Sequence, residues 1–168
     1  QLNYPRSITV DSDGFIYVAD EGSCRMQKFT SDGVYFNDWE TCSLANIDGL
    51  AVDSQNNIYV SGSTSARVEK YTSKGRLLFS IGGNKGTAEG YFLGHQYDVA
   101  VDSKDNVYVL DASGGAVGNY GVHVFSSNGT FIKRWGPFGS APLRETYQDN
   151  ELRNPAGIAI DSQDNVYI

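Results

Sequence analysis

Apolar and polar positions alternate along this chain in a pattern that is repeated four times. A run of alternating apolar residues, an Asp-Ser pair and a second apolar and aromatic run occur together at residues 8–18, 50–60, 99–109 and 158–168. In each copy, β-branched and aromatic residues flank an Asp, Asn or Gly turn, which is typical of two short antiparallel strands. We therefore expect a β-hairpin in every copy.

A second pattern follows the first three hairpins. An apolar run is followed by a polar turn with Gly and then by an aromatic-rich run; the first runs are residues 25–29, 67–71 and 121–125, and the last are 34–39, 76–81 and 130–135. Each unit thus predicts four short strands, which we call A to D in chain order. No segment sustains the 3.6-residue period of a helix. A four-stranded antiparallel unit repeated every 40 to 60 residues or so predicts the blades of a β-propeller.

The sequence motif of the repeat resembles that of a known family. The segment PAGIAIDSQDNVYI at residues 155–168, and YVAD followed by RMQKF within residues 17–29, are similar to the NHL repeat. The other copies depart from this motif where its Pro or Gly is replaced, at Ser7, Ile47, Gln96 and Asp98. The resemblance implies an all-β, NHL-type propeller of roughly six blades in a closed ring.

The strands divide into three complete blades and half of a fourth. We expect blades at residues 4–46, 47–96 and 97–154, and the first two strands of a fourth blade at 155–168. An open wedge would leave the apolar sides of its end blades in water. We therefore expect a piece of a longer propeller, the alternative being a self-assembling structural protein that associates through its exposed blade edges.

Residues that recur in every blade are expected to be structural. The repeated aspartates are predicted to accept hydrogen bonds from backbone amides in their turns, and the repeated aromatic residues to pack between sheets. A calcium loop is not expected at residues 11–14, because the ligand spacing of an EF-hand fails there. The aspartates are Asp11, Asp53, Asp102 and Asp161; the aromatic residues are Tyr17, Tyr59, Tyr108 and Tyr167, with Trp39, Phe79 and Trp135 in the D strands.

Breaks in the repeat are better candidates for function. In a propeller the A–B and C–D turns lie on one face, here the turn face, and the B–C and D–A loops on the other, here the loop face. Three insertions, at residues 82–96, 112–120 and 136–154, fall on the loop face around blade three. Long loops on a rigid scaffold often bind partners, although these could instead be variable spacers. The candidate contact residues are Tyr91, His95, Asn119, Tyr120, Arg144 and Tyr147.

Two further features bear on the compartment. Cys24 begins strand C of blade one and Cys42 follows strand D, so the two thiols could form a disulfide, or they could be unrelated. A disulfide would indicate an oxidising compartment. Asn128-Gly129-Thr130 is a glycosylation sequon in a C–D turn, a tripeptide that also arises by chance.

Charge and composition exclude several classes of function. The net charge of −7 and the scattered lysines and arginines argue against nucleic-acid binding, and no apolar stretch approaches the roughly 20 residues of a membrane span. Some proteins with this repeat or a similar propeller are peptide-amidating or streptogramin lyases, which use histidines. This chain has only His95 and His123. His123 alternates between two valines and is expected to be packed.

We therefore expect no catalytic residues, metal or cofactor in these residues. The sequence favours a non-catalytic interaction scaffold, extracellular or on a cell surface, that binds a protein or glycan through its loop face. The alternative is part of a propeller lyase whose metal site is completed by blades outside this sequence.

Overall fold

The computed structural model describes most of the chain. It covers residues 1–41, 43–44, 46–62, 64–83, 92, 96–113, 119–136, 152 and 155–168. Nearly all of the regular structure is β-strand; one short 3₁₀ helix, η1 (Glu21–Ser23), follows the second strand. Among these residues no helix is long and apolar enough to cross a membrane.

The described residues form fourteen strands in four separate antiparallel sheets, as the sequence predicts. Each sheet follows the chain order, so its strands A to D are neighbours. Sheet one holds β1 (Pro5–Val10), β2 (Ile16–Asp20), β3 (Arg25–Phe29) and β4 (Tyr35–Glu40). Sheet two holds β5 (Ile47–Val52), β6 (Ile58–Gly62), β7 (Arg67–Tyr71) and β8 (Leu77–Gly82). Sheet three holds β9 (Gln96–Val101), β10 (Val107–Ser113), β11 (Asn119–Phe125) and β12 (Phe131–Trp135). The fourth is the pair β13 (Ala159–Ile160) and β14 (Val166–Tyr167).

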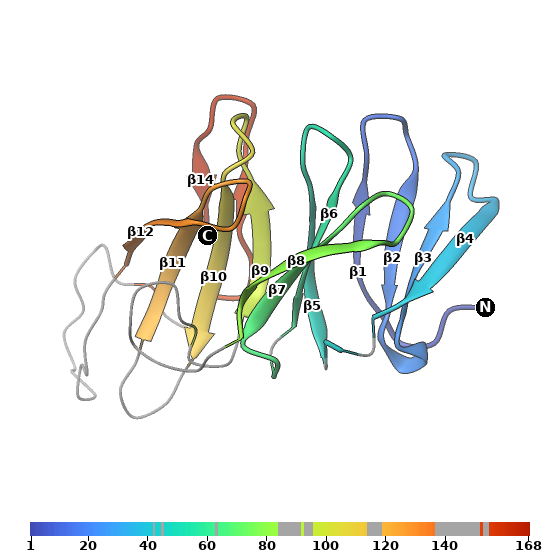
Figure 1. Ribbon diagram of the computed structural model, residues 1–168, viewed down its shortest axis with the longest axis horizontal. Helices are drawn as coiled ribbons and strands as arrows, with labels where there is room; N and C mark the ends of the chain where they lie inside the picture. Colours follow the sequence, from blue (N-terminus) through green and yellow to red (C-terminus); the bar gives the residue numbers. More distant parts are fainter. Residues whose placement is uncertain are drawn as a thin grey trace.

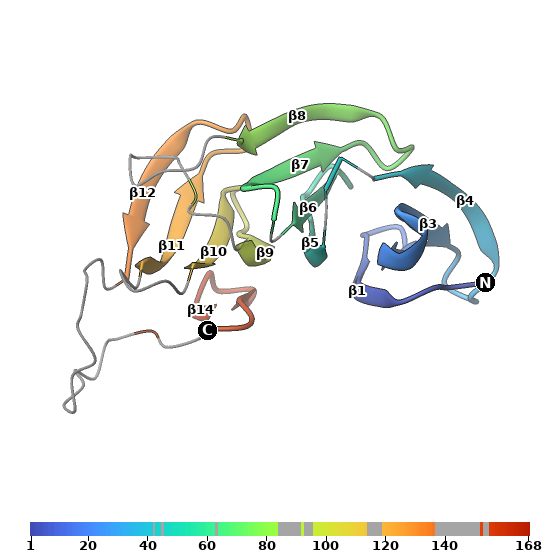
Figure 2. The ribbon, with the colours of Figure 1, turned by 90° about the horizontal axis from the view of Figure 1, so that it is seen from below.

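The sheets lie side by side, in chain order, as consecutive layers (Figure 1). Seen from below, the outer strands β4, β8 and β12 follow a curved outer side, and β1, β5 and β9 lie on the inner side (Figure 2). This is the arrangement of consecutive propeller blades, and the chain forms three complete blades and half of a fourth.

Three apolar clusters hold the blades together. Each joins the front face of one blade, which is the side toward the next blade in the chain, to the back face of its successor. Between blades one and two, for example, Tyr17 and Met26 pack against Leu50 and Ile58. The core of this protein therefore lies between sheets, and a single sheet has no core of its own.

The repeated aromatic residues of the three complete blades lie in these clusters, as predicted, but Tyr167 does not. Tyr17 and Tyr59 are fully buried, while Tyr167, on the front face of the last sheet, is 57% exposed. Trp39, Phe79 and Trp135 are partly buried, each against a different cluster. The exposure of a repeated residue thus depends on whether another blade covers it.

Candidate functional site

The loop face is where the three insertions leave the sheets. They begin and end at described strands: β8 and β9, β10 and β11, and β12 and β13. The loop-face ends of β10 and β11 lie at the lower side of Figure 1. Tyr91, His95, Arg144 and Tyr147 lie outside the described residues. Their role as contact residues stays a prediction.

One expected loop is shorter than the sequence indicated. Asn119 and Tyr120 belong to strand β11 and pair with Ser113 and Ala112 of β10. The reason is that a backbone ladder can continue past the last apolar side chain, where the sequence pattern no longer marks it. Both residues still lie at the loop-face end of blade three, although their side chains lie outside the description.

The predicted disulfide also involves an undescribed residue. Cys24 is exposed, and its backbone carbonyl accepts a hydrogen bond from the N–H of Thr41 at 2.9 Å. The end of strand D therefore lies beside the start of strand C. Cys42 is outside the described residues, so the bridge stays a prediction.

A buried polar residue occupies the same place in strand C of every complete blade. The three residues are Gln27, Glu69 and His123, each exposed by no more than 2%. They lie near the loop face on the back sides of their blades, and each pairs across the sheet with a valine of strand B. Their partners differ from blade to blade.

In blade one the polar cluster centres on Asp20. This carboxylate accepts hydrogen bonds from Gln27 Nε2 at 2.7 Å, Arg25 Nε at 3.1 Å and the backbone N–H of Asn3. Burial alone would raise the pKa of Asp20, but these donors outweigh it and hold the pKa below its ordinary value. The first residues of the chain are thereby fastened to this blade.

In blade two the cluster centres on Glu69. Its carboxylate pairs with Arg67 Nε at 2.9 Å and accepts hydrogen bonds from the hydroxyls of Tyr71 and Ser43. Ser43 belongs to the segment that leads into this blade. The cluster therefore links the connection between two blades to the sheet that follows.

In blade three the corresponding residue is His123, which is fully buried. Its Nε2 lies 3.8 Å from Asp111 Oδ2. The centroid of its ring lies 5.2 Å from the centroid of the Phe92 ring. Burial, followed by the charge of Arg134, lowers the pKa of His123 to about 4. His123 is a neutral packed residue at neutral pH, as the sequence indicated, and it has no access to a substrate in solution.

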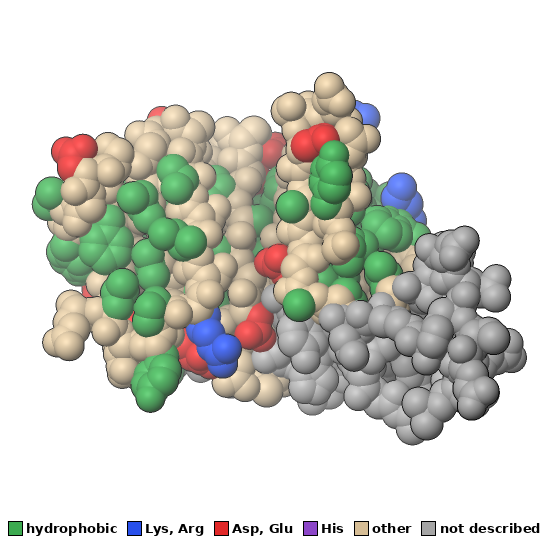
Figure 3. All heavy atoms as spheres, turned by 180° about the vertical axis from the view of Figure 1, so that it is seen from behind, with side chains coloured by type: hydrophobic (Ala, Val, Ile, Leu, Met, Phe, Trp, Pro, Cys, Tyr) green, Lys and Arg blue, Asp and Glu red, His purple; other side chains and the backbone are tan. Residues whose placement is uncertain are grey.

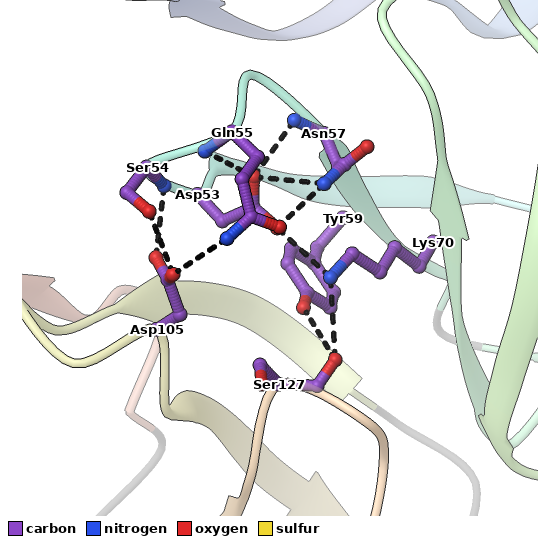
Figure 4. Close-up of polar contacts among 8 residues, drawn as sticks. All are labelled: Asp53, Ser54, Gln55, Asn57, Tyr59, Lys70, Asp105 and Ser127. Carbon is purple, nitrogen blue, oxygen red and sulfur yellow. Dashed lines mark hydrogen bonds and ion pairs between the residues drawn. The ribbon is translucent and has the colours of Figure 1, made fainter.

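The turn face carries a second set of polar contacts, centred on a buried lysine (Figure 4). Lys70 is 5% exposed and bridges Asp53 Oδ2 at 2.8 Å to the backbone carbonyl of Ser127 in the next blade at 3.2 Å. Its ammonium also lies 4.8 Å from the centroid of the Tyr59 ring. Burial would lower the pKa of Lys70, but Asp53 and Tyr59 outweigh it and raise that pKa.

Blade one repeats this arrangement with Lys28. Its ammonium lies 3.9 Å from the centroid of Phe15 and donates to the carbonyl of Ser73 in blade two at 3.3 Å. Burial lowers the pKa of Lys28. Val124 stands at the corresponding position of blade three. Sequence reasoning counted Lys28 and Lys70 among positive residues scattered along the chain, and their recurrence at one strand position was the signal that it missed.

The repeated aspartates organise the A–B turns, as predicted. Asp11 Oδ1 accepts the N–H groups of Asp13 at 3.0 Å and Phe15 at 2.8 Å, and its Oδ2 accepts the Tyr17 hydroxyl at 2.7 Å. Asp161 makes the same set of contacts, and the donors of Asn165 lower its pKa to about 2. The carboxylates of Asp11 and Asp161 are thus engaged within their own hairpins. In the described part of the chain, no group of three or more His, Cys, Asp or Glu side chains could hold a metal ion.

The glycosylation sequon lies on an exposed turn. Asn128 is exposed, and its Oδ1 accepts hydrogen bonds from Ser126 Oγ at 2.6 Å and Thr130 N at 3.1 Å. Its modification stays a prediction.

Comparisons with known proteins agree with this architecture. The NHL repeat model matches residues 2–29, and a model described as a β-propeller repeat matches residues 43–67. None of the curated proteins matches the chain in sequence.

Several solved structures are similar in fold. A streptogramin B lyase is 15% identical over 96% of this chain and 46% of its own length, with a TM-score of 0.68. Virginiamycin B lyase from Staphylococcus aureus is also 15% identical, over 96% of this chain and 47% of its own, with a TM-score of 0.66. A chain of a nidogen–laminin complex is 19% identical, over 96% and 54%, with a TM-score of 0.64. At these identities the likeness shows the fold alone, and this chain spans about half the length of each structure.

The fold and the two repeat matches define a β-propeller protein. The match at residues 2–29 is to the NHL repeat, so the chain is a β-propeller protein that carries an NHL repeat, and its described residues form three blades and half of a fourth.

Proposed function

We propose that this chain is part of a non-catalytic interaction propeller, which is secreted or displayed on a cell surface and binds a protein or glycan through its loop face. The observation that carries the proposal is the position of the three long insertions. All of them join strand ends on one face around blade three, while every A–B and C–D turn of the other face is short. Variable loops on a rigid scaffold are a common binding arrangement.

Two other observations support this proposal. One structure of similar fold is a chain of a complex between nidogen and laminin, so a propeller of this shape can belong to a protein complex. The net charge of −7 makes a basic protein surface a better partner than a nucleic acid.

The test is binding to purified extracellular-matrix proteins, including laminin, and to a glycan array. We expect Tyr120→Ala together with Tyr147→Ala to weaken binding at least tenfold without loss of folding. The matched control is Asp32→Ala with Lys74→Ala, two exposed positions in C–D turns of the opposite face, which should leave binding unchanged. Equal binding by the two double variants would refute the assignment of the loop face.

A lyase is the second candidate, since lyases of similar fold are known. One structure of virginiamycin B lyase, made inactive by replacing a histidine with alanine, contains quinupristin. His123 of this chain is fully buried between blades, so a lyase site would need His95 or residues of other blades. Conversion of quinupristin by the purified protein, together with a bound metal in elemental analysis, would support this candidate over the scaffold.

A further inference from the structure

The outer strand of every complete blade contains a β-bulge that carries a large apolar residue. In β4, β8 and β12 the pairing with strand C skips one position, occupied by Phe36, Leu78 and Ile132 respectively. These three side chains are 57%, 38% and 49% exposed. A bulge changes the direction of a side chain relative to the regular alternation of a strand. Each complete blade therefore presents an apolar side chain on the outer side of the molecule (Figure 2).

Blade two shows that this exposure does not come from a missing neighbouring blade. It lies between two described blades, and apolar clusters join it to both of them. Even so, Leu77 and Leu78 are both exposed. Strands β4 and β8 are each the last strand of a sheet, so no described strand pairs with their outer edges. An unpaired edge with exposed apolar side chains is a place where a strand of another molecule can add.

The outer segments of blades one and two carry opposite charges. Residues 32–40 hold three acidic residues and no Lys or Arg, a net charge of −3, and residues 74–82 hold two basic residues and no Asp or Glu, a net charge of +2. The charged side chains, all of them exposed, are Asp32, Asp38 and Glu40 in the first segment and Lys74 and Arg76 in the second. A molecule whose two outer edges have opposite charges can bind a second copy of itself.

The outer strand of blade three matches the acidic edge less well. Ile132 and Lys133 are exposed, but Phe131 and Arg134 are partly buried. The edge of β8 therefore offers more exposed apolar and basic side chains than the edge of β12.

An antiparallel alignment of the two edges matches their apolar and charged residues together. Residues of an antiparallel pair step in opposite directions along their strands. Placing the two bulge residues opposite each other therefore brings two acidic residues opposite two basic ones. The pairs are Phe36 with Leu78, Asp38 with Arg76, and Glu40 with Lys74. A parallel alignment of the same bulge residues forms one charged pair, Asp32 with Lys74. Apolar and opposite-charge pairs across neighbouring strands both stabilise a sheet.

We propose that β4 of one molecule binds antiparallel to β8 of a second copy, with Phe36 against Leu78 at the centre of the contact. The charged pairs beside this centre set the direction and register of the two strands. Both edges lie on the outer side of the blades (Figure 2), so the contact uses neither the faces between blades nor the loop face. Because the two edges are different surfaces, each molecule can bind one copy at each edge.

The test reverses one charge on each side of the contact. Glu40 is suited to this, because the described residues give its side chain no ion pair, whereas Asp38 pairs with Arg25 Nη1 at 2.8 Å. Glu40→Lys and Lys74→Glu each place like charges opposite one another, so each variant alone should associate about fivefold or more weakly than the unchanged protein. A mixture of the two variants restores opposite charges at every mixed contact and should associate like the unchanged protein. Sedimentation equilibrium at one ionic strength measures all the association constants.

Two matched controls keep the change in net charge the same. Asp32→Lys reverses an exposed acidic residue of the same segment that has no charged partner in the antiparallel alignment. Lys133→Glu reverses an exposed lysine of β12. Both controls should associate like the unchanged protein. Leu78→Ser removes the apolar centre and should weaken association about tenfold or more. Circular dichroism checks the folding of every variant.

Three results would overturn the proposal. The first is an unchanged protein that does not self-associate. The second is a charge-reversed variant that associates as tightly as its control. The third is a mixture of Glu40→Lys and Lys74→Glu that associates no more tightly than either variant alone. Binding of a partner at the loop face is measured separately, so failure of one proposal leaves the other standing.

Discussion

At the scale of single residues, charged side chains make the junctions between blades specific. Lys28 and Lys70 lie beneath the surface with their ammonium groups over aromatic rings, and each donates to a carbonyl of the next blade's C–D turn. A buried cation must be paired to be tolerated. Lys70 is paired with Asp53. Burial alone would raise the pKa of Asp53, but the hydrogen bond from Lys70 helps to lower it.

His123 should make the stability of the protein depend on pH. Burial lowers its pKa from 6.5 to about 4. Between these values the unfolded chain binds a proton that the folded chain does not, so the free energy of unfolding is greatest above pH 6.5 and falls as the pH drops toward 4. The loss amounts to about 3 kcal/mol at most.

Replacing this side chain isolates its contribution. His123→Gln introduces the residue that blade one has at this position, Gln27, and should flatten the acid side of the stability profile. Urea unfolding of both proteins from pH 4 to 7 measures the difference. Identical pH slopes would contradict the assignment of this titration to His123.

At the scale of elements, the C–D turns of blades two and three are packed closely against the preceding blade. Gly75 has a φ of 83°, and a Cβ there would lie 2.6 Å from the Trp39 ring of blade one. Gly33 occupies the same position in the turn of blade one with a φ of 79°, and nothing lies within 4 Å of its Cβ position. The repeated glycine therefore has a conformational role in both turns and a packing role in one.

Two matched substitutions separate these roles. Gly33→Ala should cost about 1 kcal/mol of stability, from left-handed strain alone. Gly75→Ala should cost about 1 to 3 kcal/mol more, because the indole ring must move. Thermal or urea unfolding measures both losses, and equal values would show that the turn of blade two does not press on Trp39.

The hairpins were easier to predict from sequence than the contacts between them. Alternating residues and Asp, Asn or Gly turns marked the A–B and C–D hairpins, and Asp11 bonds its turn as expected. The ends of β10 and β11 were missed, because Ser113 and Asn119 pair through backbone groups that carry no apolar signal. The burial of Lys70 was missed because it depends on a turn 57 residues away in the sequence.

At the scale of the whole molecule, a blade face that no described blade covers is more exposed than the corresponding face at a junction. Figure 3 shows hydrophobic side chains gathered over blade one. Ile8 and Val10 on its back face are 66% and 55% exposed, and Val34, just before β4, and Phe36 in β4 are also more than half exposed. Leu50, which corresponds to Ile8 in the repeat, is 8% exposed against blade one.

The same substitution at two equivalent positions should therefore have different effects. Leu50→Ala removes side-chain volume from a blade junction and should cost about 2 to 5 kcal/mol. Ile8→Ala should change the stability of this chain by less than about 0.5 kcal/mol. Urea unfolding of the two variants measures the contrast, and a large loss for Ile8→Ala would mean that this face is covered in solution.

In the A–B turns, a serine of one blade donates hydrogen bonds to an Asn or Asp in the turn of the next blade. These bonds also bear on how such a chain can lengthen over evolutionary time. The donor serine and the accepting Asn or Asp lie in the same short turn, as in Ser54 and Asn56 or Ser103 and Asp105. Duplication of the DNA that encodes one blade therefore copies both halves of a joint in a single event. The new blade therefore arrives already able to attach to its neighbours on either side.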